Sequence, residues 1–157
     1  MSSDEGLYST LTAEREHLAS SDLQSVGVLK SGHPCKILVV DDEQDIVFTL
    51  KTALTEAGFS VDAFTNPSFA FDMFTPEKYE LIILDIRMPV LNGFELYMKL
   101  LEKDNSIKVL FLTAVNEFSM YSKFKRSVSP MLGKRYYLQK PIDLKKLMQR
   151  IGEMLSI

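Results

Sequence analysis

Five short apolar runs, separated by amphipathic stretches, follow one another along the chain from residue 36 onward. Residues 36–40 form a nearly continuous apolar run rich in β-branched side chains, which predicts a strand buried on both faces. Similar runs predict further strands at residues 59–64, 80–84, 107–112 and 135–139.

The stretches between these runs carry helical patterns. Apolar residues at positions 46, 47, 50 and 54 share one helix face, and Gly58 ends that helix. Asn66 followed by Pro67 predicts the start of a short helix, because Asn caps helices well and Pro suits the first helical position. The apolar side chains of this short helix are Phe69, Ala70 and Met73. Further helices are predicted at residues 93–101, at 116–129, where the pattern is weak, and after the capping residue Asp143, at 144–155.

Strands that alternate with helices imply an α/β fold with a parallel sheet, because the helices supply the crossover connections. We place this domain at residues 35–157 and treat residues 1–34 as an N-terminal extension. The extension is rich in Ser, Asp and Glu, and a loose helical spacing of Leu7, Leu11 and Leu18 fits either one short amphipathic helix or disorder. The chain ends soon after the last predicted helix, so we expect no attached DNA-binding domain.

Composition narrows the functional classes. The chain has 46% hydrophobic residues, enough for one packed core, and its single cysteine, Cys35, excludes an internal disulfide. No signal peptide and no apolar run long enough to span a bilayer is recognisable, so we predict a cytoplasmic protein. The net charge of −3 divides into +6 from residue 114 onward and −9 before it. A basic segment of this kind is typical of a surface that binds nucleic acid, of one that binds an acidic protein, or of a helix face exposed to solvent. We favour the last interpretation.

Polar residues stand at the ends of four predicted strands. Asp41 and Asp42 follow the first strand, and Asp85, Thr113 and Lys140 follow the third, fourth and fifth. Because ligands bind at the carboxyl ends of the strands in open parallel sheets, we expect these side chains to meet.

The chemistry of this set favours a magnesium-dependent phosphoryl site. Three crowded carboxylates repel one another unless a cation joins them, and oxygen ligands with no Cys or His nearby suit Mg²⁺. Next to such an ion, Asp85 can act as a nucleophile and form an acyl phosphate. Lys140 and Thr113 can then contact the phosphoryl oxygens.

The same residues resemble the receiver domain of two-component response regulators. The resemblance covers residues 36–157 and rests on motifs that occur in the family's order. These are Ile37-Leu38-Val39-Val40-Asp41-Asp42-Glu43, Leu84-Asp85-Ile86-Arg87-Met88-Pro89 with Asn92-Gly93, Thr113-Ala114, and Tyr137-Leu138-Gln139-Lys140-Pro141. The resemblance implies a doubly wound, flavodoxin-like fold with five parallel strands in the order 2-1-3-4-5.

The resemblance also implies a role for each matched residue. Asp85 matches the phosphoacceptor and a ligand of Mg²⁺. Asp42 matches the direct metal ligand, Asp41 the acid that holds a metal-bound water, and Arg87 the residue whose backbone carbonyl binds the metal. Lys140 matches the phosphate-contacting lysine, and the Lys140-Pro141 bond is expected to be cis.

Two further residues match the conformational switch of the family. Thr113 matches the residue that moves toward the phosphoryl group, and Tyr137 the aromatic that turns inward with it. A buried aromatic with a purely structural role is the alternative for Tyr137. Ala114 matches the small residue that leaves room for the phosphoryl group.

The chain departs from the family pattern between Thr113 and Lys140, where it is several residues longer and carries Gly133-Lys134-Arg135-Tyr136 before the fifth strand. The family tunes hydrolysis through positions matching Arg87 and Val115. An apolar Val115 cannot orient an attacking water, so we predict slow self-dephosphorylation, with a phosphoryl lifetime of many minutes or longer.

These inferences predict a stand-alone response regulator that is not an enzyme. Its partners would be a histidine kinase or phosphotransfer protein and an unidentified downstream protein, with self-association of the phosphorylated form as a further option. The alternatives are a receiver-like adaptor that is never phosphorylated, an aspartyl-phosphate phosphatase and a flavin-binding electron carrier. Arg87 stands where such a phosphatase carries its second Asp, and three acids would repel a flavin phosphate.

Overall fold

A computed structural model describes residues 27, 32–114 and 137–156, and the structural statements below concern these residues. One sheet of five parallel strands forms the centre, in the order β2-β1-β3-β4-β5. The strands are β1 (Lys36–Val40), β2 (Ser60–Phe64), β3 (Leu81–Asp85), β4 (Lys108–Thr113) and β5 (Tyr137–Gln139). The predicted fold class and strand order are therefore confirmed.

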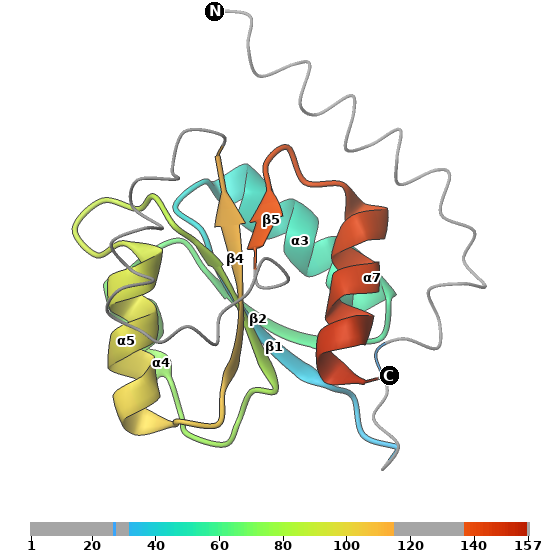
Figure 1. The fold of residues 1–157 in the computed structure, drawn as a ribbon, viewed down its shortest axis with the longest axis horizontal. Coiled ribbons are helices and arrows are strands. Elements are labelled where there is room, and N and C mark those ends of the chain that lie inside the picture. The colour runs from blue at the N-terminus through green and yellow to red at the C-terminus, as the bar shows by residue number, and fades with distance from the viewer. Residues whose placement is uncertain (1–26, 28–31, 115–136, 157) are drawn as a thin grey trace, which may run out of the picture.

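Helices cover both faces of the sheet (Figure 1). α3 (Gln44–Glu56) and α7 (Leu144–Leu155) pack on one face, and α4 (Pro67–Met73) and α5 (Gly93–Lys103) pack on the other. Each face of the sheet has its own hydrophobic core, and successive residues of β1 point to opposite faces. Ile37 and Val39 lie in the core under α3 and α7, and Leu38 and Val40 lie in the core under α4 and α5. This explains the continuous apolar runs, since a strand covered on both faces has no side for polar residues.

The helix starts agree with the capping signals in the sequence. The side chains of Asn66 and Asp143 accept hydrogen bonds from the third helical residue, and Asn92 forms a reciprocal capping box with Glu95. Gly58, with a φ of +91°, follows α3 in the left-handed region where glycine is favoured. These local signals fix where each helix begins or ends beside a strand.

Some sequence expectations need correction. Phe69 and Met73, expected on the apolar face of the short helix, are 52% and 51% exposed. Only Pro67 and Ala70 of this helix are buried, because the face turned to the sheet runs through these two residues, and the helical periodicity places Phe69 and Met73 to one side of it. Asp85 and Thr113, expected to follow their strands, are instead the last residues of β3 and β4.

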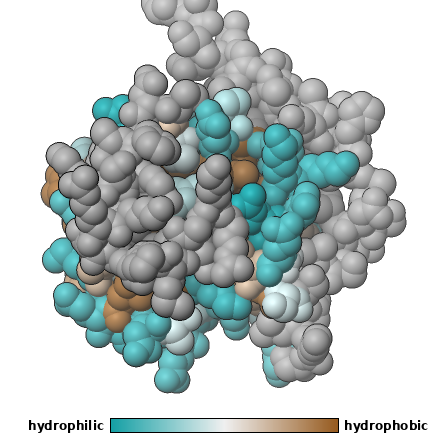
Figure 2. Space-filling view, viewed as in Figure 1, coloured by the Kyte–Doolittle hydropathy of each residue, from teal (hydrophilic) through white to brown (hydrophobic). Residues whose placement is uncertain are grey.

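Other expectations fall outside the described residues: the helix at 116–129, residues 135–136 of the fifth strand, and the extension apart from Gly27 and residues 32–34. Most described residues on the face shown in Figure 2 are hydrophilic, and the hydrophobic ones form only small patches. Among the described helices, none combines the length and the apolar character needed to span a bilayer.

Candidate functional site

Two neighbouring strands bring three carboxylates together at one edge of the sheet. β1 and β3 are paired so that Val40 lies beside Leu84, which places Asp41 and Asp85 next to each other. Asp42 follows Asp41, and one carboxylate oxygen from each of the three acids lies within 4.8 Å of the others. Asp41 and Asp85 are buried and Asp42 is exposed, so the cluster is open to solvent on one side.

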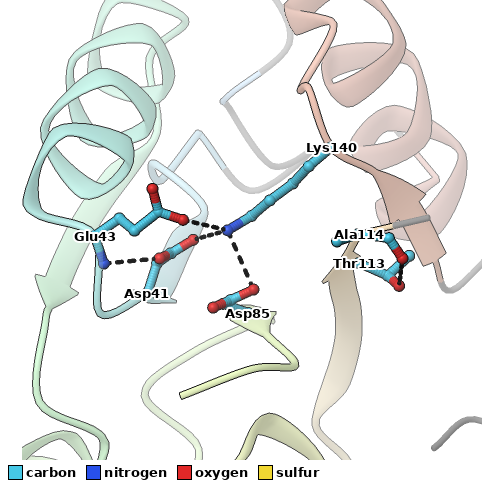
Figure 3. Close-up of polar contacts among 6 residues, drawn as sticks. All are labelled: Asp41, Glu43, Asp85, Thr113, Ala114 and Lys140. Carbon is cyan, nitrogen blue, oxygen red and sulfur yellow. Dashed lines mark hydrogen bonds and ion pairs between the residues drawn. The ribbon is translucent and has the colours of Figure 1, made fainter. Parts of the chain in front are cut away.

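Lys140 reaches this cluster from the end of β5. Its ammonium lies 2.9 Å from Asp41 Oδ2, 3.2 Å from Asp85 Oδ1 and 3.3 Å from Glu43 Oε1 (Figure 3). The backbone N–H of Lys140 donates to the carbonyl of Thr113, and the Lys140-Pro141 bond is cis, as expected. Backbone contacts thus fix the start of the lysine side chain while its ammonium bridges two strands.

The backbone beside Asp85 is held by a close approach. Gly93, the first residue of α5, lies so near β3 that an added Cβ would be 2.2 Å from the carbonyl oxygen of Asp85. The N–H of Gly93 also donates to the carbonyl of Ile86. Only glycine fits at this contact, which explains the Asn92-Gly93 pair: Asn92 starts the helix and Gly93 lets it approach the phosphoacceptor candidate.

Burial and crowding change the proton affinities of the site. Burial, strengthened by the negative charge of Asp41, raises the pKa of Asp85 to about 7, and Lys140 opposes this only in part. Burial also raises the pKa of Asp41. Burial by itself would lower the pKa of Lys140, but Asp41 and Asp85 outweigh it, so that pKa is raised and the lysine stays charged.

The donor set suits a hard divalent cation. Asp41, Asp42, Asp85 and Glu43 can carry four negative charges around the single positive charge of Lys140, so the cluster has unbalanced negative charge at neutral pH. All the available ligand atoms are oxygens, which favours Mg²⁺ over softer metals. The residues therefore fit a magnesium site, for which Asp41, Asp42 and Asp85 could supply carboxylate oxygens.

The other predicted residues that the structure describes lie on β4, on β5 and in the loop after β3. The hydroxyl of Thr113 donates to the carbonyl of Ala114 at 3.0 Å, and Figure 3 shows it apart from the ammonium of Lys140. The ring of Tyr137 stacks on Phe111, with 5.5 Å between centroids, and packs against the core on the α4/α5 side. Arg87 is exposed, two residues after Asp85. Val115, on which the lifetime expectation rests, lies outside the described residues.

Sequence analysis assigned no role to Glu43, although it belongs to the first motif. A third acid directly after Asp41 and Asp42 was a visible signal, but its contact with Lys140 joins residues 97 positions apart. Spacing along the chain does not contain that information.

Comparison with known proteins identifies the family. The sequence profile of the response regulator receiver domain matches residues 37–152. The chain belongs to the response regulator receiver family. Receivers are signalling domains of two-component systems, and members of the family bind Mg²⁺ at an acidic pocket such as this one. The resemblance found in the sequence is thereby confirmed.

Several relatives illustrate the range of this receiver family. Transcriptional regulatory protein PcoR of Escherichia coli is 35% identical over 76% of this chain and 51% of its own length. CpdR of Brucella abortus is 32% identical over 76% of this chain and 96% of its own. Sporulation initiation phosphotransferase F of Bacillus subtilis is 28% identical over 78% of this chain and 94% of its own length. The chain thus spans about half the length of some relatives and nearly all of others.

Solved structures agree on the fold. The non-phosphorylated HemR receiver domain of Leptospira biflexa has a TM-score of 0.66 at 27% identity, covering 78% of this chain and 95% of its own. CheY in the CheX–CheY–BeF₃–Mg complex of Borrelia burgdorferi has a TM-score of 0.68 at 22% identity, covering 83% and 96%. The second likeness concerns the fold alone.

Proposed function

We propose that this receiver is a phosphorylation switch in which Asp85 accepts a phosphoryl group from a phosphohistidine of a kinase or phosphotransfer protein, with Mg²⁺ at the site. The observation that carries this proposal is the meeting of three carboxylates within 4.8 Å with an ammonium 3.2 Å from Asp85. A purely structural role for these acids would leave unexplained why the protein bears the cost of burying two carboxylates that repel each other.

In the transfer step, a carboxylate oxygen of Asp85 forms a bond to phosphorus as the phosphorus–nitrogen bond of the donor breaks. The leaving imidazole keeps the electron pair and takes up a proton. Lys140 donates to a phosphoryl oxygen and so stabilises charge that develops there. Asp42, Asp85 and the backbone carbonyl of Arg87 would hold Mg²⁺ directly, and Asp41 would hold it through a water. When bound, the ion would neutralise part of the phosphoryl charge.

The response of the protein begins at β4 and β5. Thr113 ends β4, and its hydroxyl can leave the carbonyl of Ala114 to donate to a phosphoryl oxygen. Tyr137 lies on the neighbouring strand, where Phe111 pairs with it, so a shift of Thr113 reaches the Tyr137 ring through two adjacent strands. Phosphorylation then biases an existing equilibrium of the face formed by the helix predicted at residues 116–129, β5 and α7, and changes its protein contacts.

The region before Cys35 is proposed as an extension to this switch domain. Gly27 packs against Ala57–Phe59 at the end of α3, and its carbonyl accepts a hydrogen bond from the N–H of Cys35. This contact ties the end of the extension to the domain.

The decisive experiment is incubation of the full chain with acetyl phosphate and Mg²⁺, followed by intact mass measurement. We expect the wild type to gain one phosphoryl group and Asp85→Asn to gain none. Mg²⁺-dependent binding of beryllofluoride, lost in Asp85→Ala, separates the switch from an adaptor that is never phosphorylated. A wild-type protein that neither gains the phosphoryl group nor binds beryllofluoride would contradict the proposal.

A further inference from the structure

The acid site holds one side chain to which the transfer step above gives no role. Glu43 is the N-cap residue of α3, and its backbone N–H donates to Asp41 Oδ1 at 2.9 Å. Its carboxylate makes no capping hydrogen bond to the helix, although free N–H groups there would favour an acid. Instead its Oε1 lies 3.3 Å from the ammonium of Lys140 (Figure 3).

The contact with Glu43 is a hydrogen bond, whereas Asp41 Oδ2 lies 2.9 Å from the ammonium of Lys140 as an ion-pair partner and has no hydrogen-bond partner among the described residues. Asp85 Oδ1 is a third carboxylate oxygen near the ammonium, at 3.2 Å. A phosphoryl oxygen that arrives on Asp85 therefore meets an ammonium already surrounded by three carboxylate oxygens, and its contact with Lys140 strengthens when one of them moves away.

The three carboxylates differ in what release costs them. The side chains of Asp41 and Asp85 are 0% and 5% exposed, so losing the ammonium leaves a buried charge without compensation. The side chain of Glu43 is 59% exposed, and water can replace the lost contact. Glu43 is thus the partner that yields.

We propose that Glu43 is a positioning residue that holds Lys140 in the resting protein and competes with the incoming phosphoryl group for its ammonium. This inference rests on the proposed function and deepens it. Glu43 would weaken the affinity of the site for phosphoryl ligands and leave Asp85 itself unchanged as the acceptor. Its negative charge, close to an anionic ligand, acts in the same direction.

The test compares Glu43→Gln with wild type in the full chain. We expect Glu43→Gln to bind beryllofluoride about two- to fivefold more tightly at saturating Mg²⁺, as expected for loss of one largely exposed ion pair. Isothermal titration suits the measurement, since the chain has no Trp to report binding by fluorescence. Asp45→Asn is the matched control, because Asp45 is an exposed acid in the first turn of the same helix.

Phosphorylation by acetyl phosphate gives a second readout. In that reaction the bond from phosphorus to the acetyl oxygen breaks, an Asp85 oxygen bonds to phosphorus, and acetate leaves with the electron pair. We expect Glu43→Gln to lower the half-saturating acetyl phosphate concentration by a similar factor with little change in the maximal rate, while Asp45→Asn leaves both unchanged. A merely structural role would not separate these two constants.

The outcomes distinguish this inference from the proposed function. Unchanged or weaker beryllofluoride binding in Glu43→Gln, or an equal gain in Asp45→Asn, overturns the role of Glu43 while phosphorylation of the wild type continues. Failure of the wild type to bind beryllofluoride, or equal binding by Asp85→Ala, overturns the proposed function itself. A melting temperature of Glu43→Gln close to that of the wild type shows that the fold is retained.

Discussion

Two buried carboxylates at opposite ends of the sheet experience contrary environments. Asp104, in the turn that leads from α5 into β4, accepts hydrogen bonds from Glu77 N, Ser106 N and Ser106 Oγ at 2.8, 3.0 and 2.6 Å. These donors, led by the Ser106 hydroxyl, lower its pKa. Asp85 at the other end is buried beside Asp41, and its pKa is raised to about 7.

The difference separates an acid that stabilises the fold from an acid kept for chemistry. Neutral donors match the charge of Asp104, so its ionised form is the favoured one in the folded protein. At Asp85 one ammonium is shared among three carboxylates, so folding disfavours the ionised form, and a further cation would favour it. Substitution of these two aspartates is therefore expected to change the stability of the fold in opposite directions.

The largest effect is expected from Asp104→Ala, which removes three hydrogen bonds and leaves backbone N–H groups unsatisfied. We expect it to lower the free energy of unfolding by about 2–4 kcal/mol in urea titrations near neutral pH. Folding lowers the pKa of Asp104, so the ionised carboxylate stabilises the folded protein. This stabilisation is complete when the pH is above the unfolded pKa of Asp104, and it is lost as the pH falls through the folded pKa. Asp104→Asn keeps one of the two acceptor oxygens and should cost less; an equal loss would contradict this account.

Asp85→Asn should act in the opposite direction in the absence of Mg²⁺. Folding raises the pKa of Asp85 from 3.8 to about 7, so ionisation of this carboxyl opposes folding. The effect begins as the pH rises above 3.8 and is complete once the pH is above about 7. We expect Asp85→Asn to raise the free energy of unfolding by about 1–3 kcal/mol at about pH 8 and by little at about pH 4. Lower stability than the wild type at the higher pH would remove the distinction between the two acids.

Addition of Mg²⁺ should narrow the difference in stability between the wild type and Asp85→Asn. At ten times its dissociation constant, we expect Mg²⁺ to stabilise the wild type by about 1.4 kcal/mol at about pH 8. The gain should shrink as pH falls below about 7, because protons then compete for Asp85. Asp85→Asn should lose most of the gain and Asp104→Asn should keep it, as measured by urea titrations at matched ionic strength.

The two acids also differ in how visible they are in the sequence. Asp85 ends an apolar run, and the rule that parallel strands carry their functional residues at the carboxyl end predicts its place beside Asp41 and Lys140. The sheet was predictable for a similar reason, since strands covered on both faces leave continuous apolar runs. Asp104 lies in an ordinary polar turn, where its two hydrogen bonds from Ser106 are local and common. The contact with Glu77, 27 positions away, is not visible in the sequence, so nothing there marks Asp104 as a buried acid.

Other failures of prediction have the same physical origin. Phe69 and Met73 fit a helical spacing, but in so short a helix the spacing does not reveal which face meets the sheet. Glu43 stands in a recognisable motif, yet its carboxylate is directed by Lys140, which folding brings from the far end of the chain. Local signals such as caps and apolar runs succeed, whereas charge pairing between distant segments needs coordinates.

The smallest effect, and the sharpest check on the comparison, is expected from Ser106→Ala. This change removes one donor to Asp104, the hydroxyl at 2.6 Å, and retains the backbone N–H of residue 106. We expect a loss of about 0.5–1.5 kcal/mol in the free energy of unfolding, and a rise in the pKa of Asp104 toward its ordinary value.

Carboxyl-carbon NMR titration can follow Asp104 and Asp85 in the same sample. Sites without shared partners respond independently, so the pKa of Asp85 should not move. A joint shift of both carboxyls would mean that the two ends of the sheet are coupled, and that Asp104 also takes part in the switch.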